Sequence, residues 1–205
     1  MQEYTKRIIK KLSVIGLIGL VTVLAILGFE FIKRSTGNNV SQDFTKVYKK
    51  SSKQNKKLVK LTKEVNDNIR KINTLDLRGR DKDSLDLLKE TRRKNKKIKK
   101  VADNLSSSLD KLKRLLKKAP DSPKKKTVSE ALQLEIKLTK EMKDYSQKIK
   151  TFLDSLDKAI AQNSSSKKVS LQEKLKQVNK KRKQINDLNS KFLAKIEKLN
   201  STGKN

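Results

Sequence analysis

Residues 88–119 read LKETRRKNKKIKKVADNLSSSLDKLKRLLKKA, and their apolar and small residues recur at alternating spacings of three and four. The repeat consists of Leu88, Thr91, Asn95, Ile98, Ala102, Leu105, Leu109, Leu112, Leu116 and Ala119. This spacing puts side chains on one stripe of an α-helix, while lysine and arginine fill most other positions. The stretch therefore predicts a long amphipathic helix whose stripe packs against partner helices.

The same repeat occurs in three further stretches, so the sequence predicts four helices, over 40–76, 83–119, 127–161 and 170–200. Their stripes begin at Val40, Leu88, Val128 and Leu171. Similar lengths and short connections favour antiparallel neighbours. We therefore predict an all-α fold, an elongated up-down four-helix bundle over 40–200. The alternative is four helices that each form coiled coils with other molecules.

Breaks in the repeat mark the connections. Residues 33–39 contain Gly37 and are expected to be a hinge, and 76–83 contain Gly79 within a charge cluster. Pro120 and Pro123 end the second helix. Capping boxes at 127–130 and 170–173, each with Ser or Thr followed three residues later by Glu, are expected to start the last two helices. Residues 201–205 are expected to fray.

The N-terminal region has a different pattern. Residues 12–29 read LSVIGLIGLVTVLAILGF, without a charge, and Phe31 and Ile32 extend the apolar run. About 20 apolar residues span a bilayer as a helix. We predict a basic stub at 1–11 and a transmembrane helix over 12–32, from Leu12 through Phe29 to Ile32. The alternative is a cleaved signal peptide, although its apolar region is usually shorter.

Charge and composition limit the classes of function. The chain of 205 residues has a net charge of +31, of which all but +4 follows residue 34. Such a body attracts polyanions, namely anionic lipid, a cell-wall polymer or nucleic acid. Cysteine, histidine and tryptophan are absent, which removes thiolate and imidazole chemistry. Without a nucleophile–base pair or a phosphate-binding glycine loop, we expect no enzyme activity, no cofactor and no metal.

Orientation follows from the basic residues on each side of the span. Four of them precede it, which favours a cytoplasmic N-terminus and an extracytoplasmic body in the cell membrane. The bundle geometry then brings one group of lysines to the bilayer as a candidate anionic-lipid collar. The collar consists of Lys49, Lys50, Lys117, Lys118, Lys124, Lys125 and Lys126. Each would contribute about 1 kcal/mol next to an anionic leaflet.

Two further groups are candidate sites. At the opposite end, Arg78, Gly79 and Arg80 form a candidate tip contact, because arginine binds carboxylate or phosphate bidentately. The polar stripe residues Asn68, Thr91 and Arg182 set helix register or line a small pocket. Folding the first hairpin at its loop places Asn68 near Thr91, and Gln54 near residues 104–108.

Three functions remain. The first is a membrane-anchored helical scaffold, tether or subunit of a bacterial envelope assembly. The second is a ligand sensor, because residues 6–200 resemble in architecture the extracytoplasmic ligand-binding half of bacterial chemoreceptors; a second span and signalling helices are absent. The third is a cytoplasmic-facing membrane anchor for nucleic acid.

Overall fold

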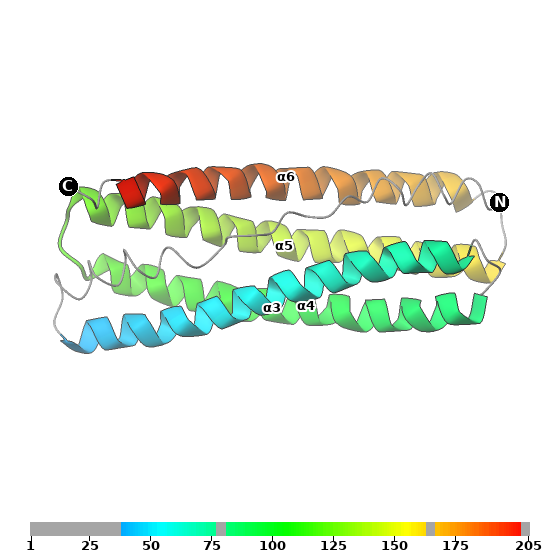
Figure 1. Cartoon of the computed structure of the whole chain (residues 1–205), viewed down its shortest axis with the longest axis horizontal. Coiled ribbons are helices and arrows are strands. Elements are labelled where there is room, and N and C mark those ends of the chain that lie inside the picture. Colours follow the sequence, from blue (N-terminus) through cyan, green and yellow to red (C-terminus); the bar gives the residue numbers. More distant parts are fainter. Residues whose placement is uncertain (1–37, 77–80, 163–166, 202–205) are drawn as a thin grey trace.

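The predicted four-helix bundle is confirmed by a computed structural model, which describes residues 38–76, 81–162 and 167–201. Helix α3 spans Asn38–Asp76, α4 Asp81–Lys117, α5 Pro123–Gln162 and α6 Lys167–Ser201. All four run along one rod (Figure 1). The described part of the chain contains helices and turns but no strand.

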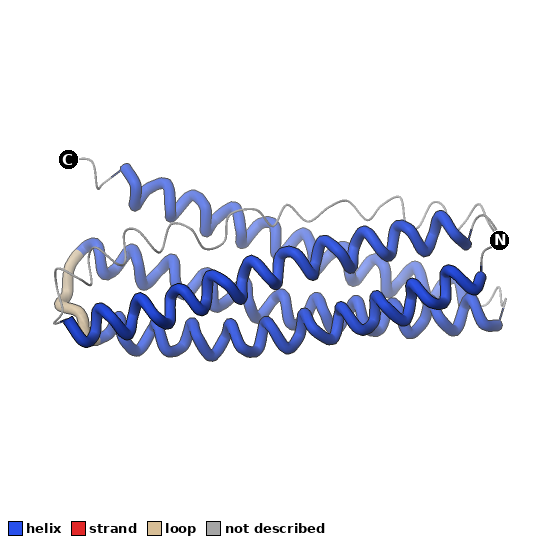
Figure 2. The backbone as a smooth tube through the Cα atoms, turned by 60° about the horizontal axis from the view of Figure 1, so that its bottom comes forward, coloured by secondary structure: helices blue, strands red, loops and turns tan. Residues whose placement is uncertain are grey.

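The helices alternate in direction. Helix α3 begins at the end of the rod where the α4–α5 turn lies and where α6 ends (Figure 1). We call this the proximal end, and the other the distal end. The large contacts follow sequence order, α3 with α4, α4 with α5 and α5 with α6. The backbones of the remaining helix pairs barely approach one another, so α3 and α6 are the outer members. Figure 2 shows the same rod after rotation about its long axis.

The core lies along the predicted stripes. Every stripe position named above for residues 88–119 is buried, all of them in α4 except Ala119, which lies just after the helix ends. Large side chains from three helices fill the middle of the rod, among them Ile69, Leu105, Tyr145 and Phe152. Burial of such side chains contributes roughly 1.5–3 kcal/mol each and holds the helices together.

The start of α5 differs from the prediction. The helix begins at Pro123, whose missing N–H is not needed in a first helical turn. The cap is Ser122, whose hydroxyl accepts a hydrogen bond from the Lys125 backbone N–H at 3.1 Å. Thr127 lies inside the helix and donates to the Pro123 carbonyl instead. The predicted capping box at 127–130 is therefore wrong.

The bounds of the other three helices also differ from the prediction. Helix α6 begins at Lys167, so Ser170 lies within the helix and the second capping box is wrong as well. Helix α3 begins at Asn38, which shortens the expected 33–39 hinge from its C-terminal side. Helix α4 runs from Asp81, two residues earlier than expected, and ends at Lys117.

The expected transmembrane helix over 12–32, with Leu12, Phe29 and Ile32, lies outside the described residues. No helix within 38–76, 81–162 or 167–201 is long and apolar enough to cross a bilayer.

Candidate functional site

The structure divides the predicted lysine collar. Lys117, Lys118 and Lys126 are exposed around the α4–α5 turn at the proximal end. Lys49 and Lys50 are also exposed, but they lie 11 and 12 residues into α3. At 1.5 Å per residue this is about 17 Å from the start of the helix. Charges are largely screened beyond about 8 Å at physiological salt, so the two groups do not act as one ring.

Lys125 has a structural role at this turn. Its ammonium donates to the Ala119 carbonyl, to the Lys117 carbonyl at 3.4 Å and to the Asp121 carboxylate at 2.9 Å. The last carbonyls of a helix have no partner within it, and a lysine supplies one here. Lys125 is therefore a cap of α4 rather than a free member of the collar. The side chain of Lys124 lies outside the described residues, as do Arg78, Gly79 and Arg80 of the candidate tip contact.

The polar stripe residues lie on three different helices. Asn68 is buried on α3 beside Glu90 of α4. The hydrogen bond from Lys94 is the main cause that lowers the pKa of the Glu90 carboxyl, and a hydrogen bond from Asn68 lowers it further. Thr91 donates to the Leu87 carbonyl of its own helix at 2.6 Å. Arg182 is half-buried on α6, where its charge opposes the burial that raises the pKa of Tyr145. The contact with Glu90, the residue before Thr91, agrees with the predicted pairing of Asn68 with this part of α4.

A set of hydrogen bonds between helices connects the middle of the bundle. Asn95 of α4 donates to the Ser146 carbonyl of α5 at 2.8 Å, and the Ser146 hydroxyl contacts Asn95 Oδ1 at 3.1 Å. The Tyr145 hydroxyl donates to Asn66 Oδ1 of α3 at 2.9 Å. The Ser108 hydroxyl donates to Gln54 Oε1 at 3.0 Å, in agreement with the predicted pairing of Gln54 with 104–108. These bonds fix the register of α3, α4 and α5.

Ion pairs on the outside of the rod supplement these bonds. Arg92 of α4 contacts Asp157 at 2.8 Å and Asp154 at 3.1 Å on α5. Lys181 of α6 contacts Glu141 of α5 at 2.7 Å, which is the main cause of the raised pKa of Lys181. These side chains are partly exposed, so each pair contributes at most about 1 kcal/mol.

One buried carboxyl was not identified as a site from the sequence. Glu135 of α5 is 2% exposed, and its Oε1 has no hydrogen-bond partner among the described residues. Burial raises its pKa to about 8, so it is mostly neutral at pH 7. It lines a small cavity with Phe44, Tyr48 and Ser51 of α3, Leu112 of α4, and Val128 and Leu132 of α5. Glu135 lies one heptad after Val128, so the repeat predicts its burial but not a role as a site.

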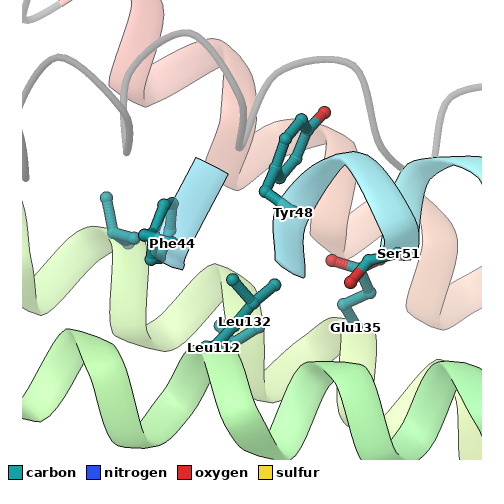
Figure 3. A pocket seen from close by; sticks show the side chains of 7 residues that line it. Phe44, Tyr48, Ser51, Leu112, Leu132 and Glu135 are labelled. Carbon is teal, nitrogen blue, oxygen red and sulfur yellow. The ribbon is translucent and has the colours of Figure 1, made fainter. Parts of the chain in front are cut away.

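The cavity around Glu135 is too small for a ligand larger than water. Its volume is about 10 Å³, which is room for about one water molecule. Figure 3 shows Glu135 reaching toward Ser51 from the opposite helix, while the Tyr48 hydroxyl points away from the carboxyl. The Ser51 hydroxyl already donates to the Val47 carbonyl at 3.0 Å. Within the described ranges, no group of three or more carboxylates is placed to hold a metal ion.

Comparison with known proteins gives one family. The model of DUF1993, a domain of unknown function, matches residues 99–205, which is just over half of the chain. The chain belongs to the DUF1993 family. The DUF1993 match begins within α4 and covers α5 and α6. No curated protein and no solved structure matches the chain significantly.

The DUF1993 segment depends on residues outside it for part of its packing. Glu135, Tyr145 and Ser146 lie within the matched range, whereas Asn66 and Asn95 precede it. The hydrogen bonds from Tyr145 to Asn66 and between Ser146 and Asn95 therefore join the DUF1993 segment to α3 and to the first half of α4. In this protein the four helices form one packed unit.

Proposed function

We propose that this protein is a non-enzymatic, membrane-anchored helical tether or scaffold subunit of a bacterial cell envelope, and that its basic body contacts anionic partners. The apolar segment 12–32 supplies the anchor, and the rod holds the binding surface away from the bilayer. The N-terminus is cytoplasmic and the body extracytoplasmic, in line with the basic residues that precede the apolar segment.

The observation that carries the proposal is the charge on the first helix of the rod. Eight lysines and no acidic residue lie between Thr45 and Lys63. All eight are exposed on α3, and within the described ranges none is paired with a carboxylate. Unpaired like charges repel one another in the folded state and attract an external polyanion. A rigid rod with such a surface suits binding rather than chemistry.

The small cavity at Glu135 gives little support to a ligand sensor. A sensor needs a pocket for a small molecule, and such pockets usually measure about 300–1,000 Å³. The cavity at Glu135 is far smaller, at about 10 Å³. An anchor for nucleic acid has the necessary charge, and it differs from our proposal in the side of the membrane on which the body lies.

Membrane fractionation of the full-length chain tests the anchor. We expect the protein to remain in the membrane during alkaline extraction and to need detergent for release. A variant with Leu20→Lys and Leu24→Lys places two charges in the middle of the apolar segment, each unfavourable there by about 3 kcal/mol. That variant should appear in the soluble fraction, while Lys33→Gln with Arg34→Gln should not.

Protease digestion of intact cells tests the side of the body. The proposal expects cleavage in the α4–α5 turn at Lys117 or Lys118 without cell lysis. Protection in intact cells together with cleavage in lysed cells contradicts the envelope function and favours the anchor for nucleic acid.

A further inference from the structure

The packing of α3 on α4 fixes which residues lie along the outer side of their contact. Lys94 of α4 contacts Glu64 of α3 at 3.1 Å, and Ser108 contacts Gln54 at 3.0 Å. Residues seven positions apart keep the same place on a helix whose core stripe follows a heptad repeat. Lys57 and Lys50 therefore lie on the same side of α3 as Glu64, one and two heptads toward the proximal end. Residues four positions apart are neighbours on a helix surface. Lys60, Lys53 and Lys46 therefore lie beside Glu64, Lys57 and Lys50.

These relations define a group of residues that we call the lysine face. On α3 the group contains Lys57 and Lys50 together with their neighbours Lys60, Lys53 and Lys46. On α4, Lys97 lies three residues after Lys94, and Lys111 lies two heptads after Lys97. The lysine face consists of Lys46, Lys50, Lys53, Lys57, Lys60, Lys97 and Lys111, all exposed.

Acidic residues border the lysine face but do not interrupt it. Glu64 and Glu90, both in contact with Lys94, mark its distal limit. Asp43, one heptad before Lys50, marks its proximal limit. Asp103 of α4 lies on the opposite side of the helix, where it pairs with Lys143 of α5 at 2.9 Å. Asp110 lies one heptad after Asp103 and so shares that opposite side.

The position of the lysine face along the rod argues against a bilayer as its partner. It begins about 12 Å and ends about 33 Å from the first residue of α3, at 1.5 Å per residue. A rod anchored at its proximal end holds these charges beyond the screening distance of about 8 Å. A polymer that lies lengthwise along α3 and α4 can contact all seven lysines.

The chemistry of the lysine face also narrows the polymer. The lysine ammonium is a point charge on a flexible stem, so it binds phosphate without selecting for the groups attached to that phosphate. The face contains neither an aromatic side chain on which a base could stack nor an arginine for bidentate contacts to a base. A phosphate polymer without bases can make every contact that such a surface offers.

We propose that the lysine face binds a linear polyol polymer linked by phosphodiesters, lying lengthwise along the α3–α4 contact. The inference rests on the proposed function for the extracytoplasmic position of the rod, where such a polymer belongs to the cell wall. Binding is electrostatic, indifferent to the sequence of the polymer, and strongly dependent on salt and on polymer length.

The test uses the full-length chain in discs of zwitterionic lipid and poly(glycerol phosphate) as the probe. We expect the affinity to fall with salt at a slope of log K against log salt of about −4 to −5, because single chains release roughly 0.7 counterions per lysine. Polymers too short to span about 20 Å, the length of the lysine face, should bind at least tenfold more weakly.

Two variants with equal charge separate the lysine face from the total charge. The face variant carries Lys50→Gln, Lys53→Gln, Lys57→Gln and Lys111→Gln. The control carries Lys176→Gln, Lys180→Gln, Lys183→Gln and Lys191→Gln, four exposed lysines of α6. The face variant should bind at least tenfold more weakly and lose about 3 from the slope, at about 0.7 per lysine. The control should change the affinity less than threefold.

Other outcomes overturn the proposal. Equal weakening in both variants means that total charge, not the lysine face, binds the polymer. Tenfold tighter binding of single-stranded DNA with the same number of phosphates assigns the face to nucleic acid. Binding to anionic vesicles, but not to the polymer, assigns it to lipid. None of these results alters membrane extraction, so failure of this inference and failure of the proposed anchor remain distinguishable.

Discussion

At the scale of single residues, Glu135 links stability to pH. In the unfolded chain its carboxyl titrates near 4.5, whereas in the fold burial raises the pKa to about 8. The folded protein therefore holds a proton that the unfolded chain releases between these two pH values. The associated stability is fully present below pH 4.5 and is lost as the pH rises through about 8.

Glu135→Gln tests this linkage, because glutamine has a similar shape and does not titrate. The variant should gain about 2–4 kcal/mol relative to the wild type between pH 4 and pH 8. Urea unfolding at several pH values measures the difference. Glu173→Gln makes the same substitution at an exposed position on α6 and serves as the control. A gain that is independent of pH contradicts the assignment.

The two candidate caps of α5 give a second prediction at this scale. Ser122→Ala removes the hydroxyl that accepts the Lys125 N–H and should destabilise the protein by about 1 kcal/mol. Thr127→Ala, within the helix, should be neutral or slightly stabilising because alanine has the higher helix propensity. Thermal unfolding of both variants distinguishes the observed cap from the one expected from sequence.

The cap also shows where local sequence rules were insufficient. Thr127 and Glu130 match the capping box, but Ser122 before Pro123 is an equally good signal five residues earlier. Tertiary contacts decide between them: Glu130 pairs with Lys195 of α6 and Lys125 caps α4. Neither contact can be inferred from the spacing of residues within α5.

At the scale of helices, the heptad repeat predicted the buried stripe well but underestimated its width. A second row is buried beside the stripe, with Thr62 and Ile69 on α3 and Thr139 and Ser146 on α5. A stripe of two positions per heptad suffices for a two-stranded coiled coil, whereas a bundle covers a wider face. The polar residues of this second row, among them Ser146, were therefore missed as bonds between helices.

The contact between Asn95 and Ser146 provides the prediction at this scale. Each is buried, so removing one leaves the other without its partner. A cycle of Asn95→Ala, Ser146→Ala and the double variant should give a coupling energy of about 1–3 kcal/mol. Denaturant unfolding measures all three variants.

Thr139 offers the matched control for this cycle. Its hydroxyl donates to the Glu135 carbonyl of its own helix at 2.9 Å. Asn95→Ala and Thr139→Ala should therefore add within about 0.5 kcal/mol. Coupling of similar size in both cycles indicates general loosening of the core rather than a specific bond between α4 and α5.

At the scale of the whole molecule, the fold and the charge act against each other. The core and the register bonds bring α3 and α4 together, while the lysines on their outer side repel. Composition revealed the total charge, but only the packing of α3 on α4 showed which lysines lie side by side. The predicted collar therefore grouped Lys49 and Lys50 with the lysines of the α4–α5 turn, whereas in the structure they lie 11 and 12 residues from the start of α3.

Salt should therefore stabilise the folded rod even without a polymer. Raising the ionic strength from about 0.01 to about 0.1 M shortens the screening length from about 30 to about 10 Å and weakens the repulsion among the lysines. We expect the Tm of the full-length chain to rise by several degrees, since 1 kcal/mol corresponds to about 2–4 °C at this size.

The face variant, with Lys50, Lys53, Lys57 and Lys111 replaced by glutamine, should be more stable at low salt and respond less to added salt. The α6 control variant, with Lys176, Lys180, Lys183 and Lys191 replaced, removes the same total charge from an outer helix and should keep more of the wild-type response. If calorimetry finds identical salt responses in the two variants, the repulsion is spread evenly over the rod and is not concentrated where α3 meets α4.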